Sequence, residues 1–376
     1  MKKICQDMSH GTVASVVIGF FILTSFTACN KWQDYLPDKV PDEPKFLPGM
    51  WSLSNALASN NVAFKPFVID PLLVDSRGFE FVEPGMVWGT SHGMGYVNLY
   101  NVVFATRGIS KVVQIPSAGG GSGKPAAVVV NRAAASFKLS NQSVAKIIIG
   151  STDGILSGWN DDAGTMALVI KNNSPKSVYT GLTIGTHNGQ EFLYAANFGS
   201  GKIEVFDQNF SPVHSKKFID PLLPKGFSPF NVRCIEDYLV VTYAKPAANG
   251  EGLNEQGNGI INIFTLGGNH VKRLATKGIL NSPWGITILP AGFLDGINEP
   301  TLLVANHGNG RLTGFSPAGK FLGELQDSRS NAMVLTGIWG LSFETPGQNN
   351  ALSTIYLSVS RVGGNPTGYI AFFVRF

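Results

Sequence analysis

The sequence LYAANFGSGKIEVFD at residues 193–207 returns, one residue class after another, as LLVANHGNGRLTGFS at residues 302–316. In each copy an apolar run ends at an asparagine, a Gly-x-Gly turn reverses the chain, and an alternating strand pattern follows. This order of signals predicts a β-hairpin. Because the same supersecondary unit is used more than once, the chain is expected to be a repeat protein.

Weaker copies of the hairpin occur at residues 87–100, 147–159, 239–264 and 355–372. The six copies align on one residue at the end of the first hairpin strand, about 54 residues apart on average: Ser91, Ser151, Asn197, Tyr243, Asn306 and Val359. A further apolar strand precedes most hairpins, at residues 181–184, 230–233, 284–288 and 338–343. Each repeat is therefore predicted to be a four-stranded antiparallel blade.

The pentapeptide IDPLL occurs twice, at residues 69–73 and 219–223, and three blades fit between the copies. We therefore predict an all-β fold, a six-bladed β-propeller of four-stranded antiparallel blades over residues 61–376. The alternative is an unrelated β-sandwich, but a sandwich need not repeat its turn sequence. The 44 glycines and the 14 % of charged residues agree with many tight turns and with strands that are buried on both faces.

The first 60 residues are expected to export and tether the protein. Two lysines precede an apolar stretch at residues 13–26, which is too short for a membrane span and predicts a signal peptide over residues 1–28. The residues before Cys29 resemble the cleavage box of bacterial lipoproteins, in which the cysteine carries the lipid. Residues 29–60 are expected to form a lipid anchor and a Pro-rich tether. The protein is thus expected in the cell envelope, as an outer-membrane lipoprotein.

Cysteine usage and net charge restrict the partners. With Cys5 removed and Cys29 lipidated, Cys234 stands alone in an apolar strand pattern, which predicts a buried, inert thiol and no intrachain disulfide. Loss of residues 1–28 removes two lysines and one aspartate, so the formal charge falls from +4 to +3. This weak bias indicates no nucleic-acid partner, and membrane contact is expected only through the lipid on Cys29.

The loops that follow the aligned positions are expected to ring one mouth of the central channel. His92 and His307 occupy the same place in their repeats, and Asp153 stands in a corresponding loop. The segments that enter blades four, five and six add aromatic and amide side chains to this mouth. The predicted ligand-binding residues are His92, Asp153, Asn197, Phe230, Asn231, Tyr243, Trp284, Asn306, His307 and Trp339.

Two interpretations of these side chains stay open. Aromatic and amide groups in a concave site suit a small polar ligand. The same aromatic rings could instead fill the space between blades, and the same amides could satisfy turn backbone.

The sequence assigns no catalytic residue and no cofactor. The motif GTSHG at residues 89–93 matches a nucleophile elbow, but a strand pattern follows it where that motif requires a helix. A central calcium ion would need converging oxygen ligands, and only Asp153 is an acidic candidate in these loops. The histidines lack zinc-binding spacing. We expect no metal site, with calcium as the one cofactor left open.

Several stretches are similar to an uncharacterised family of exported bacterial proteins. These are YTGLTI (179–184), FLYAANF (192–198), SPFN (228–231), TYAK (242–245), NGII (258–261), SPWGI (282–286) and IWGL (338–341). The resemblance spans most of residues 65–345 and implies a six-bladed propeller of NHL- or lactonase-like type. It implies export as well, and no particular activity.

The leading interpretation is a cell-envelope lipoprotein whose propeller binds a small polar ligand, a glycan or an envelope protein. The alternative is a lactonase-type hydrolase or lyase with a central divalent cation and His92 or His307 as general base. Several oxygen ligands converging on the axis at about 2.3–2.6 Å would favour the enzyme. A purely structural role in an envelope complex predicts an exposed apolar patch instead.

Overall fold

A computed structural model describes residues 45–103, 106–248, 250–344, 354–362 and 365–375. Within these ranges the regular structure is β-strand, apart from two short 3₁₀ turns at Val62–Phe64 and Asp161–Ala163. The predicted signal peptide, Cys29 and the first part of the predicted tether lie outside the described residues. In the part of the chain that is described, no helix is long and apolar enough to cross a membrane.

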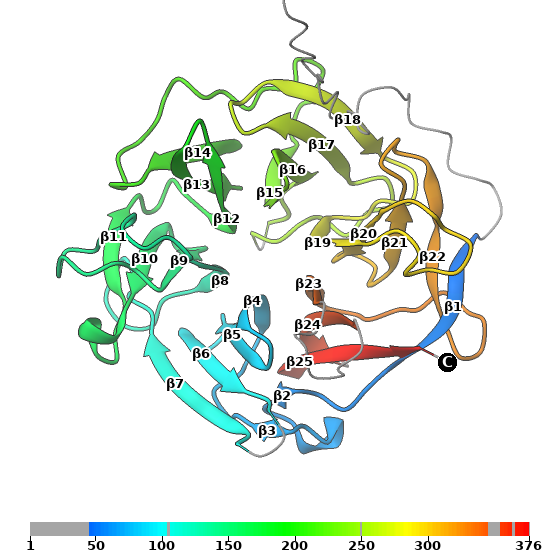
Figure 1. Cartoon of the computed structure of the whole chain (residues 1–376), viewed down its shortest axis with the longest axis horizontal. Coiled ribbons are helices and arrows are strands. Elements are labelled where there is room, and N and C mark those ends of the chain that lie inside the picture. Colours follow the sequence, from blue (N-terminus) through cyan, green and yellow to red (C-terminus); the bar gives the residue numbers. More distant parts are fainter. Residues whose placement is uncertain (1–44, 104–105, 249, 345–353, 363–364, 376) are drawn as a thin grey trace, which may run out of the picture. The chain divides into compact units, whose positions relative to one another are not determined.

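Four groups of consecutive strands form separate antiparallel sheets, in which neighbours along the chain are also neighbours in the sheet (Figure 1). The first contains β4 (Ser76–Glu83), β5 (Met86–Ser91), β6 (Tyr96–Asn101) and β7 (Gly108–Gln114). The second contains β8 (Pro125–Val130), β9 (Ile147–Ser151), β10 (Ile155–Trp159) and β11 (Leu168–Asn172). The third contains β12 (Tyr179–His187), β13 (Gln190–Asn197) and β14 (Lys202–Asp207). The fourth contains β15 (Ser228–Ile235), β16 (Tyr238–Ala244), β17 (Ile260–Thr265) and β18 (His270–Thr276).

The remaining strands form two further groups that are joined into one extended sheet. The fifth group contains β19 (Pro283–Leu289), β20 (Thr301–Asn306), β21 (Leu312–Phe315) and β22 (Phe321–Asp327). The sixth contains β23 (Ile338–Glu344), β24 (Thr354–Val362) and β25 (Asn365–Arg375), followed by β2 (Ala58–Ser59) and β3 (Val68–Ile69). The two groups are joined by β1 (Phe46–Leu53), which pairs in parallel with β22 and antiparallel with β25.

The all-β prediction is confirmed, and so are the four-stranded antiparallel sheets and the predicted hairpins. Two features differ from the expectation. The third group has three strands among the described residues. Residues 46–53, expected in the tether of residues 29–60, lie in the sheet as β1, because their backbone completes the edges of β22 and β25.

The first strands of the groups line a shared centre (Figure 1). β4 contacts β8, β8 contacts β12, and the series continues through β15, β19 and β23, which returns to β4. Glycines allow this close approach: a Cβ atom at Gly78 would lie 2.7 Å from the carbonyl oxygen of Ala126, and one at Gly285 would collide with that of Trp339. The groups therefore follow one another around an axis.

The aligned residue of each repeat has one place in the fold. Each lies at or near the end of the second strand of its group and pairs with a residue near the start of the first strand. The pairs are Ser91 with Ser76, Ser151 with Pro125, Asn197 with Tyr179, Tyr243 with Pro229, Asn306 with Pro283 and Val359 with Ile338. All six aligned residues are buried.

The two IDPLL pentapeptides make equivalent contacts. The carboxylate of Asp70 accepts hydrogen bonds from Asn98 Nδ2 at 2.7 Å and from the hydroxyl of Tyr100 at 2.6 Å. The carboxylate of Asp220 accepts from Asn262 Nδ2 at 3.0 Å and from Arg273 Nε at 3.0 Å. In both copies a buried carboxylate therefore ties the connection before a group to the third strand of that group, and the donors compensate its burial.

Strand β1 packs through Trp51, which is 2 % exposed and lies over Phe293 with ring centroids 5.9 Å apart. We expect Trp51→Ala to lower the free energy of unfolding by about 3–5 kcal/mol, because the lost ring leaves a cavity at the junction of two groups. Denaturant unfolding followed by circular dichroism measures this loss. The control Val62→Ala, which truncates a side chain that is 73 % exposed, should change it by less than about 0.5 kcal/mol. Equal small losses in both variants would show that β1 is not part of the cooperative core.

Candidate functional site

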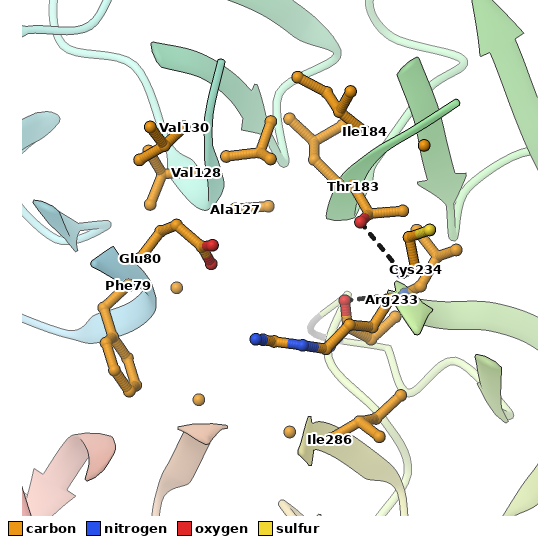
Figure 2. Close-up of a pocket in the computed structure, with 18 of the residues that line it drawn as sticks. Phe79, Glu80, Ala127, Val128, Val130, Thr183, Ile184, Arg233, Cys234 and Ile286 are labelled. Atoms are coloured by element: carbon orange, nitrogen blue, oxygen red, sulfur yellow. Dashed lines mark hydrogen bonds between the residues drawn. The ribbon is translucent and has the colours of Figure 1, made fainter. Parts of the chain in front are cut away.

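A cavity of about 310 Å³ lies on the axis between the first strands (Figure 2). Small and apolar residues of these strands keep it open. The lining includes Gly78, Phe79 and Glu80 of β4, Ala127 to Val130 of β8, Leu182 to Gly185 of β12, Asn231 to Cys234 of β15, Gly285 and Ile286 of β19, and Gly340 and Leu341 of β23. Every group thus contributes to this one cavity, which we call the axial cavity.

Two groups of opposite charge point into the axial cavity from different sheets. Figure 2 shows Glu80 of β4 and Arg233 of β15 extending toward its centre from opposite sides. Burial raises the pKa of Glu80, although the guanidinium groups of Arg233 and Arg132 favour its charged form. Neither Glu80 nor Arg233 forms a salt bridge with another of the described residues. Both groups are therefore available to a ligand.

Thr183 and Cys234 form one wall of the axial cavity. The hydroxyl of Thr183 accepts a hydrogen bond from the backbone N–H of Cys234 at 3.0 Å, which links strand β12 to strand β15 of the next sheet (Figure 2). The thiol, predicted to be buried, is only partly buried. Burial nevertheless raises its pKa, so it is a weak nucleophile near neutral pH.

The predicted mouth residues form a closed aromatic cluster. The ring of Trp339 lies 3.8 Å from that of His307, 5.5 Å from that of Trp284 and 5.7 Å from that of Phe230. Phe198 packs on Phe230 at 4.6 Å. These five side chains, the axial aromatic cluster, are buried or nearly so. The tryptophans and phenylalanines fill space here, and of them Trp284 also lines the axial cavity.

A buried ionic network covers the axial aromatic cluster. The guanidinium of Arg77 lies 4.5 Å from the ring centroid of Trp339 and donates to Asp75 and to Glu251 Oε1 at 3.0 Å each. His92 Nδ1 donates to Asp75 Oδ2 at 2.9 Å. Burial alone would raise the pKa of Asp75, but the hydrogen bond from His92 and the charge of Arg77 hold it well below its usual value.

The two histidines of the predicted mouth differ in their contacts. His92 Nε2 lies 3.0 Å from the hydroxyl of Thr152, and burial together with the charge of Arg77 lowers its pKa. His307 Nδ1 donates to the carbonyl oxygen of Ile338 at 2.9 Å. Its Nε2 faces Glu251 Oε2 at 4.0 Å, beside a second cavity of about 530 Å³.

The predicted amide residues are occupied by backbone and by neighbouring side chains. Asn197 Oδ1 accepts from the N–H groups of Val178 and Ser200 at 3.0 Å each. Asn306 Oδ1 accepts from the N–H of Asn281 at 2.9 Å. Asn231 Nδ2 donates to the carbonyl oxygen of Trp284 at 2.8 Å, and Asn231 lines the axial cavity as well.

Two predicted residues lie apart from the others. Tyr243 is buried in an apolar cluster between the third and fourth groups. Asp153 has a buried Oδ1 with no hydrogen-bond partner among the described residues, and burial raises its pKa. The structure thus brings together Phe230, Trp284, His307 and Trp339, and joins His92 to them through the ionic network.

The charged residues of the axial cavity were not among those predicted from the sequence. Glu80 and Arg233 stand inside first strands that are otherwise mostly buried, in the segments RGFEF (77–81) and NVRCI (231–235). A charge in such a strand is a signal, because an isolated buried charge is costly. Strand β4 was not predicted, so Glu80 had no position in the repeat.

The axial residues do not fit the central divalent cation of the lactonase-type alternative. Such a cation requires several converging oxygen ligands. Glu80 instead faces the guanidinium of Arg233 across the axial cavity (Figure 2). Besides Glu80, the lining holds one further carboxylate, that of Glu191, and it also holds a second guanidinium, that of Arg132. Among the residues that the structure describes, no group of three or more His, Cys, Asp and Glu side chains could hold a metal ion.

No protein-family model matches the sequence. The uncharacterised protein L690 of Acanthamoeba polyphaga mimivirus is 27 % identical over 317 residues, which cover 80 % of this chain and 81 % of that protein. The uncharacterised protein R640 of the same virus is 28 % identical over 285 residues, or 73 % of this chain and 52 % of that protein. These relatives are viral, whereas the sequence resemblance pointed to bacteria.

Two solved structures share the fold. The soluble aldose sugar dehydrogenase of Escherichia coli in its apo form has a TM-score of 0.54 at 11 % identity, covering 87 % of this chain and 100 % of its own. A catalytically inactive virginiamycin B lyase of Staphylococcus aureus with quinupristin has a TM-score of 0.50 at 13 % identity, covering 85 % and 88 %. Both neighbours are β-propeller-like, and at these identities the likeness shows a β-propeller-like fold alone.

Burial lowers the pKa of His307 in the folded protein, so the unfolded chain binds a proton more readily. The free energy of unfolding should therefore fall as the pH decreases below about 6.5, the usual histidine value. We expect His307→Gln to reduce this loss between about pH 7 and pH 5 by roughly 1 kcal/mol or more. Thermal denaturation across this range measures it. The exposed His214→Gln is the control, and an unchanged slope in His307→Gln would contradict the assignment.

Proposed function

We propose that this chain is an exported cell-envelope lipoprotein whose six-bladed β-propeller binds a small polar acid in the axial cavity. The observation that carries the proposal is the position of Glu80 and Arg233, which enter one cavity from opposite sides without an ion-pair partner among the described residues (Figure 2). Unpaired charged groups of this kind are costly to bury unless a ligand completes them.

Six blades are supported by the cycle of first strands. Each of β4, β8, β12, β15, β19 and β23 begins one group, and each contacts the next around the axis. The N-terminal strands β1 and β2 supply the outer part of the last group by pairing with β25. A ring closed by strands from both ends of the chain leaves few open edges.

The chemistry of the axial cavity suggests the class of ligand. A guanidinium binds carboxylate or phosphate through two parallel hydrogen bonds, so Arg233 is suited to the acid group. Glu80 can accept a hydrogen bond from a hydroxyl or amine, and it can donate one when protonated. A volume of about 310 Å³ is near the lower end for ligand pockets. A small hydroxy acid or amino acid fits these requirements.

The other partners considered for the protein have less support. A glycan or an envelope protein would have to bind at the second cavity, beside His307 and Glu251, where Glu251 is already paired with Arg77. The lactonase-type hydrolase or lyase needs a central cation, which the axial residues do not suit. We therefore propose binding without a cofactor and propose no catalytic residue.

Binding can be tested with a panel of small hydroxy acids and amino acids and their neutral amides. We expect stabilisation by the acids alone in thermal-shift assays, with about tenfold weaker affinity in Arg233→Gln by calorimetry, since one charge-assisted contact contributes at least 1.4 kcal/mol. Glu80→Gln should change which acids bind. A bound acid should also slow alkylation of Cys234, read by mass spectrometry.

The control for the binding test is Arg329→Gln, because Arg329 is exposed and lies outside the axial cavity. Its affinities should equal those of the unmodified protein. If no acid stabilises the protein, or if Arg233→Gln and Arg329→Gln bind equally well, the proposed site is wrong.

The lipid anchor is tested separately through Cys29. In bacterial cells the unmodified protein should be found in the membrane fraction, because a lipid on this cysteine would hold it there. Cys29→Ser should move it to the soluble fraction, whereas Cys234→Ser should leave it in place. Membrane association that persists in Cys29→Ser would contradict lipidation.

A further inference from the structure

The third group differs from its neighbours at its outer edge. In the neighbouring groups a full fourth strand, β11 or β18, pairs with the third strand, β10 or β17. After β14 the chain instead turns and returns only briefly. The N–H of Asp207 donates to Ser211 O at 2.9 Å, and the N–H of Val213 donates to Val205 O at 2.8 Å, where the pairing ends.

These two bonds identify which backbone groups of β14 face outward. Hydrogen bonds of an antiparallel strand alternate between its two sides. Since Val205 and Asp207 bond on the outer side, Ile203 faces outward as well. Among the described residues no backbone group pairs with the N–H or C=O of Ile203 or with the N–H of Val205. Such an edge is a template for an added strand.

A groove runs along this edge. Beyond Val213 the chain turns toward the fourth group, where Lys216 Nζ donates to the carbonyl oxygen of Leu266 at 3.1 Å. The space between β14 and this departing segment measures about 720 Å³. The side chains of Ile203, Val205 and Phe218 contribute apolar wall to it. The groove is therefore wide enough for an extended chain beside β14.

The lining of the groove is basic. Lys171, Lys202, Lys216 and Lys217 line it, together with His214. Glu204 is the one acidic residue in the lining that the structure describes, and its carboxylate is already engaged. Glu204 Oε2 accepts from the hydroxyl of Tyr179 and Oε1 accepts from Asn197 Nδ2, both at 2.7 Å. An occupant of complementary charge is acidic.

We propose that β14 docks an extended acidic segment of a partner protein by strand addition. The backbone of that segment pairs with the outward groups of Ile203 and Val205, and its acidic side chains meet Lys202 and Lys217. Backbone pairing supplies affinity in this mode of recognition, and the side chains supply specificity. The surface is separate from the axial cavity and does not depend on the proposed ligand.

Fluorescence anisotropy with the full chain tests the proposal. The probe is a labelled peptide of about ten residues that alternates glutamate and valine, which suits an edge strand. We expect it to bind, and we expect the double variant Lys202→Glu and Lys217→Glu to weaken binding at least about tenfold. The same variant should gain affinity for the matching lysine–valine peptide. Lys320→Glu, at an exposed site outside the groove, is the control and should bind like the unmodified protein.

A second peptide separates strand addition from simple charge attraction. Methylation of alternate backbone nitrogens removes the hydrogen-bond donors and keeps every charge. Loss of binding on methylation supports pairing with β14. The proposal is overturned if the methylated peptide binds as well as the parent, if a single-stranded oligonucleotide of similar length competes equally, or if the parent peptide does not bind.

Discussion

Closure of the ring of sheets is the constraint on which the rest of the structure depends. The first strands are buried because each has a neighbour on both sides, and β23 must return to β4 for this to hold at the ends of the chain. Strands β1 and β2 complete the last group, since β1 joins β25 to β22 and β2 pairs with β25 after nearly the whole chain has intervened. Without them, the apolar faces of the first and last groups would be left to water.

The same closure divides the axis into two chemically different ends. Near one end the first strands β15, β19 and β23 begin with large aromatic residues, and Trp339 packs against His307 and Phe230 to fill the space. Arg77 lies over this packing and is neutralised by Asp75 and Glu251. Beyond it Gly78, Gly185, Gly285 and Gly340 of four first strands line the axis, and a cavity remains.

The outer edges of the sheets are paired in most groups and left open at β14. In most groups a fourth strand pairs with the outer edge of the third strand, and β1 pairs with the edges of β22 and β25. At β14 the connecting segment leaves early and reaches the fourth group, where Lys216 Nζ donates to the carbonyl oxygen of Leu266. Exposed edges in natural proteins are usually blunted by charge. Here Lys202 and Lys217 blunt the edge against other basic strands and leave it attractive to acidic ones.

The sequence by itself determined the local units. The hairpin at residues 193–207 and its copy at residues 302–316 could be recognised because turn chemistry and strand alternation act over a few residues. The repeated IDPLL pentapeptide is also visible in the sequence, and its Asp70 and Asp220 each accept a hydrogen bond from an asparagine of the third strand of the following group. The clustering of Phe230 with Trp339 also followed from alignment of the repeats.

Only the tertiary structure decided which side chains enter the axial cavity. Glu80 and Arg233 belong to different sheets, and nothing local in the chain relates them. The addition of β1 to β22 and β25, and the early end of pairing at Val213, likewise depend on contacts between distant segments. Local propensity cannot encode such contacts, because they exist only after the ring has closed.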